Sequence, residues 1–158
     1  MIFRLEDLNE DCAKQMCTWK YGGDCSVYNV PKWDIMVSQK WAITINKRRQ
    51  DEFKAVIDEN KELCGYIRFI NKDEYVLVGL GLKPSLCGQG YGKSFMELLK
   101  LECCKKYGSK KIVLEVRSFN ERAIRCYKRA GFKIVDAYDK DTLIGKGKFI
   151  RMEFSPKK

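Results

Sequence analysis

The stretch YVLVGLGLKPSLCGQGYGKSFMELLKLECCKKYG, residues 75–108, decides the fold of this chain. It opens with a nearly all-apolar run, residues 75–82, which is typical of a strand covered on both faces. It ends in a segment whose apolar residues recur at helical spacing from Phe95 to Cys103, and Gly108 stops that helix. Three glycines stand between the two elements. The order is therefore strand, glycine loop, long helix.

The residues that follow complete a crossover. KIVLEV, residues 111–116, reads as a second buried strand, so the two strands should be parallel and the connection right-handed. SFNE, residues 118–121, has the pattern of a capping box at a helix start, and Gly131 stands where a C-terminal glycine belongs. The last two apolar segments, FKIVDAY and KFIRMEF, are predicted to form a pair of terminal strands.

The residues before this stretch mix both kinds of element. Periodicity predicts a strand over 2–5, a helix from Asp7 to Trp19, a second helix over 34–48, and strands over 53–57 and 63–70. With 158 residues the chain has the length of one domain, residues 1–158. The expected fold class is α/β in the mixed, α+β sense.

Composition excludes several kinds of chemistry. The chain has no histidine, which excludes Ser-His-Asp and Cys-His catalytic units and His-ligated metal sites. Its eight cysteines contain no CxxC pair, so we expect free thiols and no metal. The net charge of +10 suits an anionic ligand, but the basic residues are scattered along the chain, so we do not expect nucleic acid as a partner.

No segment of the sequence predicts a membrane span or a signal peptide. The longest apolar stretch, residues 76–82, is far shorter than the roughly 18 residues that a membrane span needs. The first residues, MIFRLEDLNED, turn acidic at once, unlike a signal peptide. We therefore expect a cytoplasmic protein with no membrane partner.

The glycine loop, residues 88–94, is the most informative motif. Glycines allow a close backbone approach, and the first turn of a helix offers unpaired N–H groups to an anion, so phosphate is the natural ligand. A tight turn that needs positive φ is the simpler alternative. A P-loop would need its first glycine at position 87, where Cys87 stands, and the next strand lacks the aspartate for magnesium. The dinucleotide pattern GxGxxG is not matched.

Two blocks of the chain resemble the GCN5-related N-acetyltransferase (GNAT) family. Residues 87–92, CGQGYG, are similar to its [RQ]xxGx[GA] loop, although Cys87 replaces the usual Arg or Gln. Residues 114–132, LEVRSFNERAIRCYKRAGF, are similar to its LxVxxxNxxAxxxYxxxGF segment. The resemblance covers about residues 75–138. It implies a mostly antiparallel central sheet with a splayed parallel strand pair, 75–82 and 111–117, and helices on both faces.

The resemblance implies acetyl-CoA as co-substrate and no metal. The pantetheine would pair with the backbone of Leu80, Gly81 and Leu82. The pyrophosphate would lie on the N–H groups of Gly88, Gln89, Gly90, Tyr91, Gly92 and Lys93. Asn120 matches an asparagine of the family that contacts the cofactor; capping of its own helix is the alternative.

The resemblance also suggests two catalytic residues. Tyr127 matches the general acid of the family, and the alternative is a core tyrosine with a satisfied hydroxyl. Glu115 matches the glutamate base of the ribosomal-protein N-terminal acetyltransferases, five residues before the asparagine. Burial in an apolar strand would raise its pKa toward a useful value. The alternative for Glu115 is an ion pair with Arg117, on the same strand face.

The expected function is transfer of an acetyl group from acetyl-CoA to a primary amine, by direct attack in a ternary complex. A non-catalytic acyl-CoA-binding or sensor module on the same fold is the alternative. We expect an acceptor side over about 1–72, a cofactor core over 73–138 and C-terminal strands over 132–155. The acceptor, a small molecule or a peptide, is left open, as is the choice between monomer and homodimer. Aromatic residues with one acid flank the candidate acceptor loop, and core packing under a long loop is the alternative that we favour for them: Trp19, Tyr21, Asp24, Tyr28 and Trp33.

Overall fold

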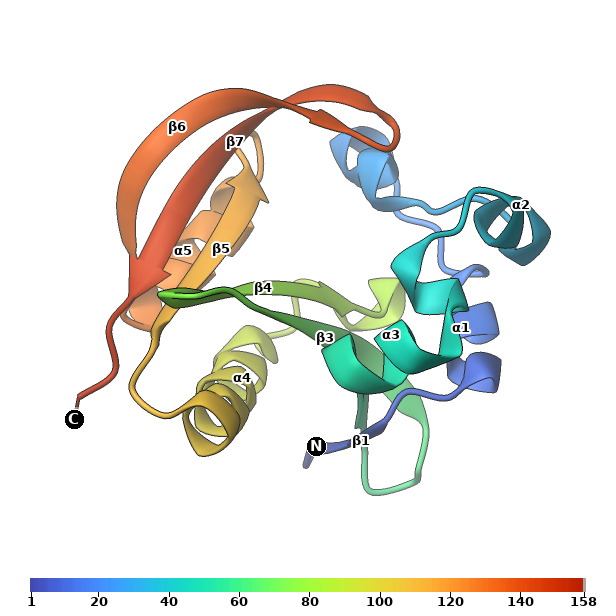
Figure 1. Cartoon of the computed structure of the whole chain (residues 1–158), viewed down its shortest axis with the longest axis horizontal. Helices are drawn as coiled ribbons and strands as arrows, with labels where there is room; N and C mark the ends of the chain where they lie inside the picture. The colour runs from blue at the N-terminus through green and yellow to red at the C-terminus, as the bar shows by residue number, and fades with distance from the viewer. Residues whose placement is uncertain (158) are drawn as a thin grey trace. The chain divides into compact units, whose positions relative to one another are not determined.

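The computed structural model describes residues 1–157, and Figure 1 labels its elements along the chain. Within those residues one seven-stranded sheet has the order β1-β2-β3-β4-β5-β7-β6. The helices and strands are β1 (Arg4–Asp7), α1 (Glu10–Met16), α2 (Trp33–Ser38), α3 (Asn46–Glu52), β2 (Phe53–Ile57), β3 (Leu63–Asn71), β4 (Tyr75–Leu82), α4 (Gly92–Tyr107), β5 (Lys111–Arg117), α5 (Glu121–Arg129), β6 (Lys133–Thr142) and β7 (Gly145–Phe154). Three short 3-10 helices add η1 (Gly23–Tyr28), η2 (Ala42–Thr44) and η3 (Pro84–Leu86).

The strand pairing confirms the mixed fold class. β4 and β5 are parallel, in a register that runs from Tyr75↔Lys111 to Val78↔Leu114. The pairs β1–β2, β2–β3, β5–β7 and β7–β6 are antiparallel. The predicted parallel pairing of the two buried strands and the predicted pairing of the last two strands are therefore both confirmed.

The chain divides into two compact units, which we describe one at a time. The first comprises Met1–Arg68 and Leu80–Gln89; the second comprises Phe69–Gly79 and the chain from Gly90 onward. The prediction of a single domain over 1–158, with its three functional parts, stays a prediction.

In the first unit, β1, β2 and β3 pack against short helices. Asn9 caps α1 by accepting a hydrogen bond from the Cys12 N–H at 2.8 Å, and acidic residues in the first turn suit the helix dipole. Buried apolar side chains of the unit form one cluster: Leu8, Ala13, Trp19, Met36, Ile43, Phe53, Ala55, Ile57 and Leu63. Trp19 thus belongs to the core rather than to an open loop.

The single helix predicted over 34–48 is wrong. The structure has α2, η2 and α3 there, and the chain turns sharply between the first two, where Lys40 has a φ of 57°. Buried Arg49 holds the later pieces together, because its guanidinium donates to the Ile43 carbonyl at 2.8 Å and to Asn46 Oδ1 at 2.6 Å. Apolar spacing alone does not reveal such a turn, since each short helix still buries its own residues.

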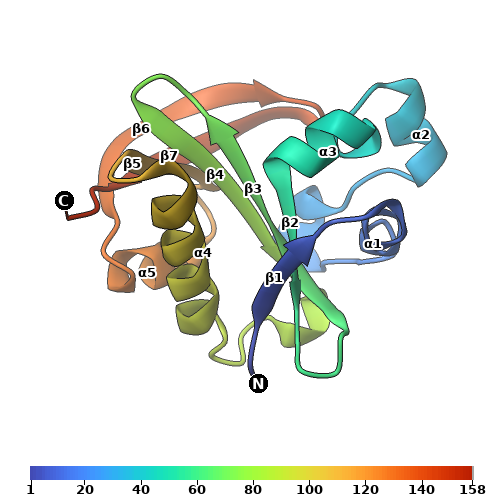
Figure 2. The same ribbon diagram turned by 60° about the horizontal axis from the view of Figure 1, so that its bottom comes forward.

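In the second unit, α4 and α5 lie side by side in both views (Figures 1 and 2). The buried face of α4 carries Phe95, Met96, Leu99 and Cys103, as the apolar spacing predicted. Among the described residues, no helix is both long and apolar enough to cross a bilayer.

Two local predictions in this region need correction. β4 is fully buried only at Val76 and Val78, and its remaining residues are half-buried, so it is not a strand covered on both faces. α5 is capped by Asn120, whose Oδ1 accepts from the Ala123 N–H at 3.2 Å, so the helix does not start with a capping box at Ser118. The glycine predicted at the end of α5 is confirmed, since Gly131 has a φ of 98°.

Candidate active site

The glycine loop has a backbone that side chains would disturb. Gly88 and Gly90 have φ values of 74° and 85°, in the left-handed region that glycine adopts without strain. The loop leads directly into α4, which starts at Gly92 with no side-chain cap and no acidic residue in its first turn. The N–H groups and the positive dipole end at this position are therefore suited to an anion.

Gly92 has a different reason to be glycine. A Cβ at this position would lie 2.7 Å from the Cys126 Sγ and 3.9 Å from the Cys126 Cβ. Cys126 belongs to α5, so this contact sets how closely α5 approaches the first turn of α4. The sequence motif contained Gly92, but nothing in it pointed to Cys126.

Cys87 stands where the resemblance expects Arg or Gln. Its thiol lies 3.6 Å from the carbonyl oxygens of both Leu82 and Lys83, and the side chain is half-buried. This position therefore adds no positive charge to the loop. Gln89 instead donates a short hydrogen bond to the Ser85 carbonyl, which closes a turn that contains Gly88.

The end of β4 carries tight contacts within the first unit. The Leu82 carbonyl accepts a hydrogen bond from the Tyr21 hydroxyl at 2.6 Å. A Cβ on Gly81 would lie 2.4 Å from the ring of Tyr66, so only glycine fits beside that ring. Burial, with a smaller contribution from Tyr66, raises the pKa of Tyr21 and keeps its hydroxyl protonated as the donor.

Tyr127 and Asn120 lie at opposite ends of α5 in the second unit. Tyr127 is half-buried and its ring centroid is 6.4 Å from that of Phe132. Asn120 caps the helix, which was one of its two expected roles. The structure places Leu80–Gln89 in the first unit, and Gly90, Glu115, Asn120 and Tyr127 in the second.

Glu115 has different partners from those expected. Its carboxylate accepts a hydrogen bond from the Tyr138 hydroxyl and another from the Lys140 ammonium, each at 2.6 Å. The alternative for Glu115, an ion pair with Arg117, is wrong, because the Arg117 guanidinium lies over the Phe149 ring, 4.6 Å from its centroid. Lys140 and Tyr138 lie on β6, two strands away in the sheet order, which no local pattern reveals.

The pKa of Glu115 shifts in the opposite direction from the expected one. Burial by itself raises the pKa, but hydrogen bonds from Lys140 and Tyr138, with the nearby charges of Lys140 and Arg151, lower it overall. Burial and the bond to Glu115 raise the pKa of Tyr138 to about 12, so that phenol remains the donor. The Glu115 carboxylate is therefore a stabilised anion and a weaker base than a free carboxylate.

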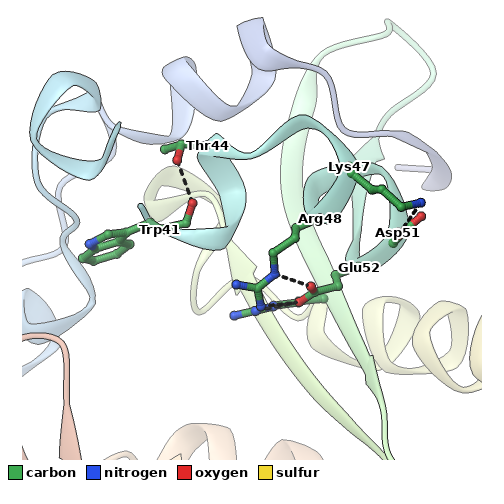
Figure 3. A network of polar contacts seen from close by, with 7 residues as sticks. Trp41, Thr44, Lys47, Arg48, Asp51 and Glu52 are labelled. Carbon is green, nitrogen blue, oxygen red and sulfur yellow. Dashed lines mark hydrogen bonds and ion pairs between the residues drawn. The ribbon is translucent and has the colours of Figure 1, made fainter. Parts of the chain in front are cut away.

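A further polar network in the first unit was not predicted. Glu52 ends α3 and accepts hydrogen bonds from Arg48 of the same helix, as Figure 3 shows, and from Arg68 of β3. A single arginine inside the apolar strand 63–70 was the only sequence signal for it. Its partner could not be inferred, because the helix predicted over 34–48 ended before Glu52, and no predicted element contained that residue.

Charge is distributed unequally between the two units. The first holds 12 basic and 11 acidic residues, a net charge of +1, whereas the second holds 19 basic and 10 acidic residues, a net charge of +9. The positive charge of the chain therefore lies with the second unit, which contains α4. All eight cysteines are free thiols, and the described residues contain no group of three or more potential metal-ligating side chains.

Comparisons with known proteins agree with this geometry. A family model described as the acetyltransferase (GNAT) family matches residues 13–132. A comparison with curated proteins found no match. Among solved structures, a chimera of Vibrio cholerae spermidine N-acetyltransferase SpeG and hSSAT has a TM-score of 0.75 at 17% identity, over 98% of this chain and 96% of the other.

Two further solved structures share the fold. The ribosomal-protein-alanine N-acetyltransferase from Escherichia coli has a TM-score of 0.67 at 16% identity, over 98% of this chain and 94% of its own. The Vibrio cholerae spermidine N-acetyltransferase in complex with CoA and spermine has a TM-score of 0.69 at 16% identity, over 97% and 95% of the two chains. At these identities the likeness shows the fold alone.

Proposed function

Because this chain belongs to the GNAT family of acetyltransferases, we propose that it transfers the acetyl group of acetyl-CoA to a primary amine by direct attack in a ternary complex. One observation carries the proposal: a loop with two left-handed glycines leads into a helix whose first turn has neither a side-chain cap nor an acidic residue. That helix belongs to the unit with a net charge of +9. This arrangement suits the pyrophosphate of CoA.

The proposed cofactor contacts are mainly backbone groups. Leu80, Gly81 and Leu82 are assigned to the pantetheine, and the N–H groups of residues 88–93 to the pyrophosphate, with Lys93 adding charge. Asn120 contributes through the helix start that it caps. A relative of the same fold has been solved with CoA, which supports this cofactor. Eight free thiols suit a reducing compartment such as the cytoplasm.

The proposed chemistry needs no covalent intermediate. The neutral amine attacks the thioester carbonyl, a C–N bond forms, the C–S bond breaks, and the leaving thiolate takes a proton. Tyr127 is the proposed acid, because a phenol hydroxyl can donate its proton to the leaving thiolate. Glu115 is retained as the proposed base, although its lowered pKa and its two donors weaken it in that role.

A non-catalytic acyl-CoA-binding module is the second candidate. It is favoured by the occupied carboxylate of Glu115 and by Cys87 at a position where the family carries Arg or Gln. It predicts CoA binding without any acetyl transfer.

The test has two parts. Calorimetry with CoA, acetyl-CoA and ATP-Mg should show that the first two bind without magnesium; binding of ATP-Mg alone would exclude a GNAT function. A panel of amines is then incubated with acetyl-CoA, and free CoA is quantified by chromatography, because the eight thiols of the chain would react with a thiol dye. Release of CoA with formation of an amide supports the enzyme, whereas binding without release supports the second candidate.

A further inference from the structure

Two arginines from different elements converge on one carboxylate in the first unit. The Arg48 Nε lies 2.9 Å from the Glu52 Oε2, one helical turn away on α3 (Figure 3). From β3, the Arg68 Nε and Nη2 lie 2.9 Å and 2.6 Å from the Glu52 Oε1. Glu52 thus fixes both guanidinium groups in place.

The cluster carries more positive charge and more donors than its own anion can neutralise. Two guanidinium groups against one carboxylate leave a net charge of +1, and a guanidinium has more N–H donors than these bonds use. The Glu52 side chain is only 16% exposed, whereas Arg48 is 48% exposed and Arg68 is 28% exposed. Burial raises the pKa of Glu52, but its bonds with Arg48 and Arg68 lower it overall, so the carboxylate stays charged.

Two aromatic rings lie beside the arginines within the same unit, with Phe53 buried in the core and Tyr66 half-buried. The Arg68 guanidinium lies 5.0 Å from the centroid of the Phe53 ring, and that ring is 6.3 Å from the ring of Tyr66. Tyr66 in turn lies against Gly81 of β4. The pair of cations and the backbone assigned to pantetheine are therefore linked by apolar rings.

From this arrangement we infer that Arg48 and Arg68 form an oxyanion site for the acceptor, so that the acceptor is an amine that also bears a carboxylate or a phosphate. Planar guanidinium groups held by a third residue recognise both anions in bidentate geometry. The half-buried ring of Tyr66 suits an apolar body between the anion and the amine. The inference rests on the proposed function. It also excludes polyamines, because two guanidinium groups repel a polycation.

Matched acceptors test the substrate class. The carboxylate arm compares phenylalanine with 2-phenylethylamine, and the phosphate arm compares O-phosphoethanolamine with ethanolamine. In at least one arm, the amine that bears the carboxylate or phosphate should have a kcat/KM roughly ten times or more that of the matched amine without it. A charge-assisted hydrogen bond to the arginines is expected to have an effect of this size. The arm that responds identifies the anion. Equal values in both arms, or a preference for spermidine, would overturn the inference.

A binding measurement separates this inference from catalysis. The probes 3-phenylpropionate and phenyl phosphate have the anion but no amine, and the matched uncharged probe is 3-phenylpropanamide. Guanidinium NMR signals of the full chain should shift with an anionic probe and not with the amide. This result stands even if no amine is acetylated. If both kinds of probe bind alike, the arginines are not an oxyanion site.

Variants separate the site from general charge. Arg68→Met and Arg48→Met should each weaken binding of the anionic probe about tenfold. Lys47→Met removes a cation from the same helix, one that is paired with Asp51 and 85% exposed, and should change binding less than twofold. If Lys47→Met weakens probe binding as much as the arginine variants do, the effect comes from the overall charge of the chain and not from an arginine site. Arg48→Met carries the test if Arg68→Met does not fold.

Glu52→Gln distinguishes the site from a purely structural ion pair. If Glu52 and the arginines only hold α3 to β3, removing the carboxylate charge should lower probe binding as much as removing an arginine. An oxyanion site should instead retain or gain probe binding, because the amide oxygen of Gln still accepts hydrogen bonds from the arginines, while the local positive charge rises and donors are freed. A Glu52→Gln variant that matches the arginine variants would overturn the inference.

Discussion

The candidate sites of the two compact units differ in composition: backbone groups form the one in the second unit, and side chains form the one in the first. The second unit, with a net charge of +9, offers the backbone start of α4, next to left-handed Gly90 and the closely packed Gly92. The first unit, with a net charge of +1, offers side chains: the arginine pair on Glu52 and the tyrosines beside β4. A backbone site depends on local conformation, whereas a side-chain site depends on which elements pack together. The four predictions below test this difference.

The largest effect is expected at Tyr127. Tyr127→Phe keeps the packed ring and removes only the hydroxyl, so kcat should fall by about 10²–10⁴ while acetyl-CoA affinity and the melting temperature barely change. Steady-state kinetics, calorimetry and thermal unfolding check this. If Tyr127→Phe keeps the full kcat under conditions where the chemical step limits the rate, Tyr127 only packs in the second unit and is not the acid.

Gly90→Val should have the next largest effect. A β-branched residue at a φ of 85° is strained by about 1–3 kcal/mol, and its side chain would crowd the amides, so the Kd for CoA should rise by roughly tenfold or more. Gly23 is the matched control in the first unit, because its φ is 57° and it also has open space around it. Gly23→Val should strain the backbone equally and leave the Kd for CoA unchanged. Equal losses in both variants would mean that strain acts through global stability.

A smaller effect is expected where α5 meets α4. Gly92→Ala places a methyl against the Cys126 Sγ, where a Cβ would be at 2.7 Å, so the thiol or the helices must shift. The KM for acetyl-CoA should therefore rise about threefold to tenfold. Cys126→Ala removes the obstructing sulfur and should restore the KM in the double variant. A double variant no better than Gly92→Ala would show that the methyl itself, and not the contact, blocks the cofactor.

The smallest effect concerns two half-buried carboxylates, Glu52 in the first unit and Glu115 in the second. Glu115 and Glu52 both have lowered pKa values, so each contributes stability that is present above its unfolded pKa and is lost as pH falls through the lower folded pKa. Glu115→Gln should lower the free energy of unfolding by about 1 kcal/mol at pH 7. The difference in this free energy between the variant and the wild type should shrink below pH 4.5. Denaturant unfolding at several pH values checks this.

Glu52→Gln should lower the free energy of unfolding more than Glu115→Gln does at pH 7. The Glu52 carboxylate accepts hydrogen bonds from two guanidinium groups, whereas the Glu115 carboxylate accepts them from one ammonium and one phenol. If the loss from Glu115→Gln grows rather than shrinks at low pH, the direction assigned to its pKa is wrong. If Glu115 is the base, the acidic limb of the pH–rate profile should also disappear in Glu115→Gln.

Local sequence patterns predicted most of the second unit. β4, α4, β5, α5 and the final strand pair all appear where periodicity and glycines placed them, within a few residues. The same reasoning failed over residues 34–48, where a turn at Lys40 separates short helices that keep a helical apolar spacing. Periodicity reports which residues face a core, and three short helices can satisfy it as well as one long helix.

The sequence by itself determined the glycine loop, the helix it precedes and the parallel crossover, because these depend on φ preferences and on the spacing of neighbouring residues. Only the tertiary structure decided the partners of charged groups. Arg68 reaches Glu52 across 16 residues of sequence, and Lys140 reaches Glu115 across 25. Such pairs depend on strand order and register, which arise when the sheet assembles and leave no local pattern in the chain.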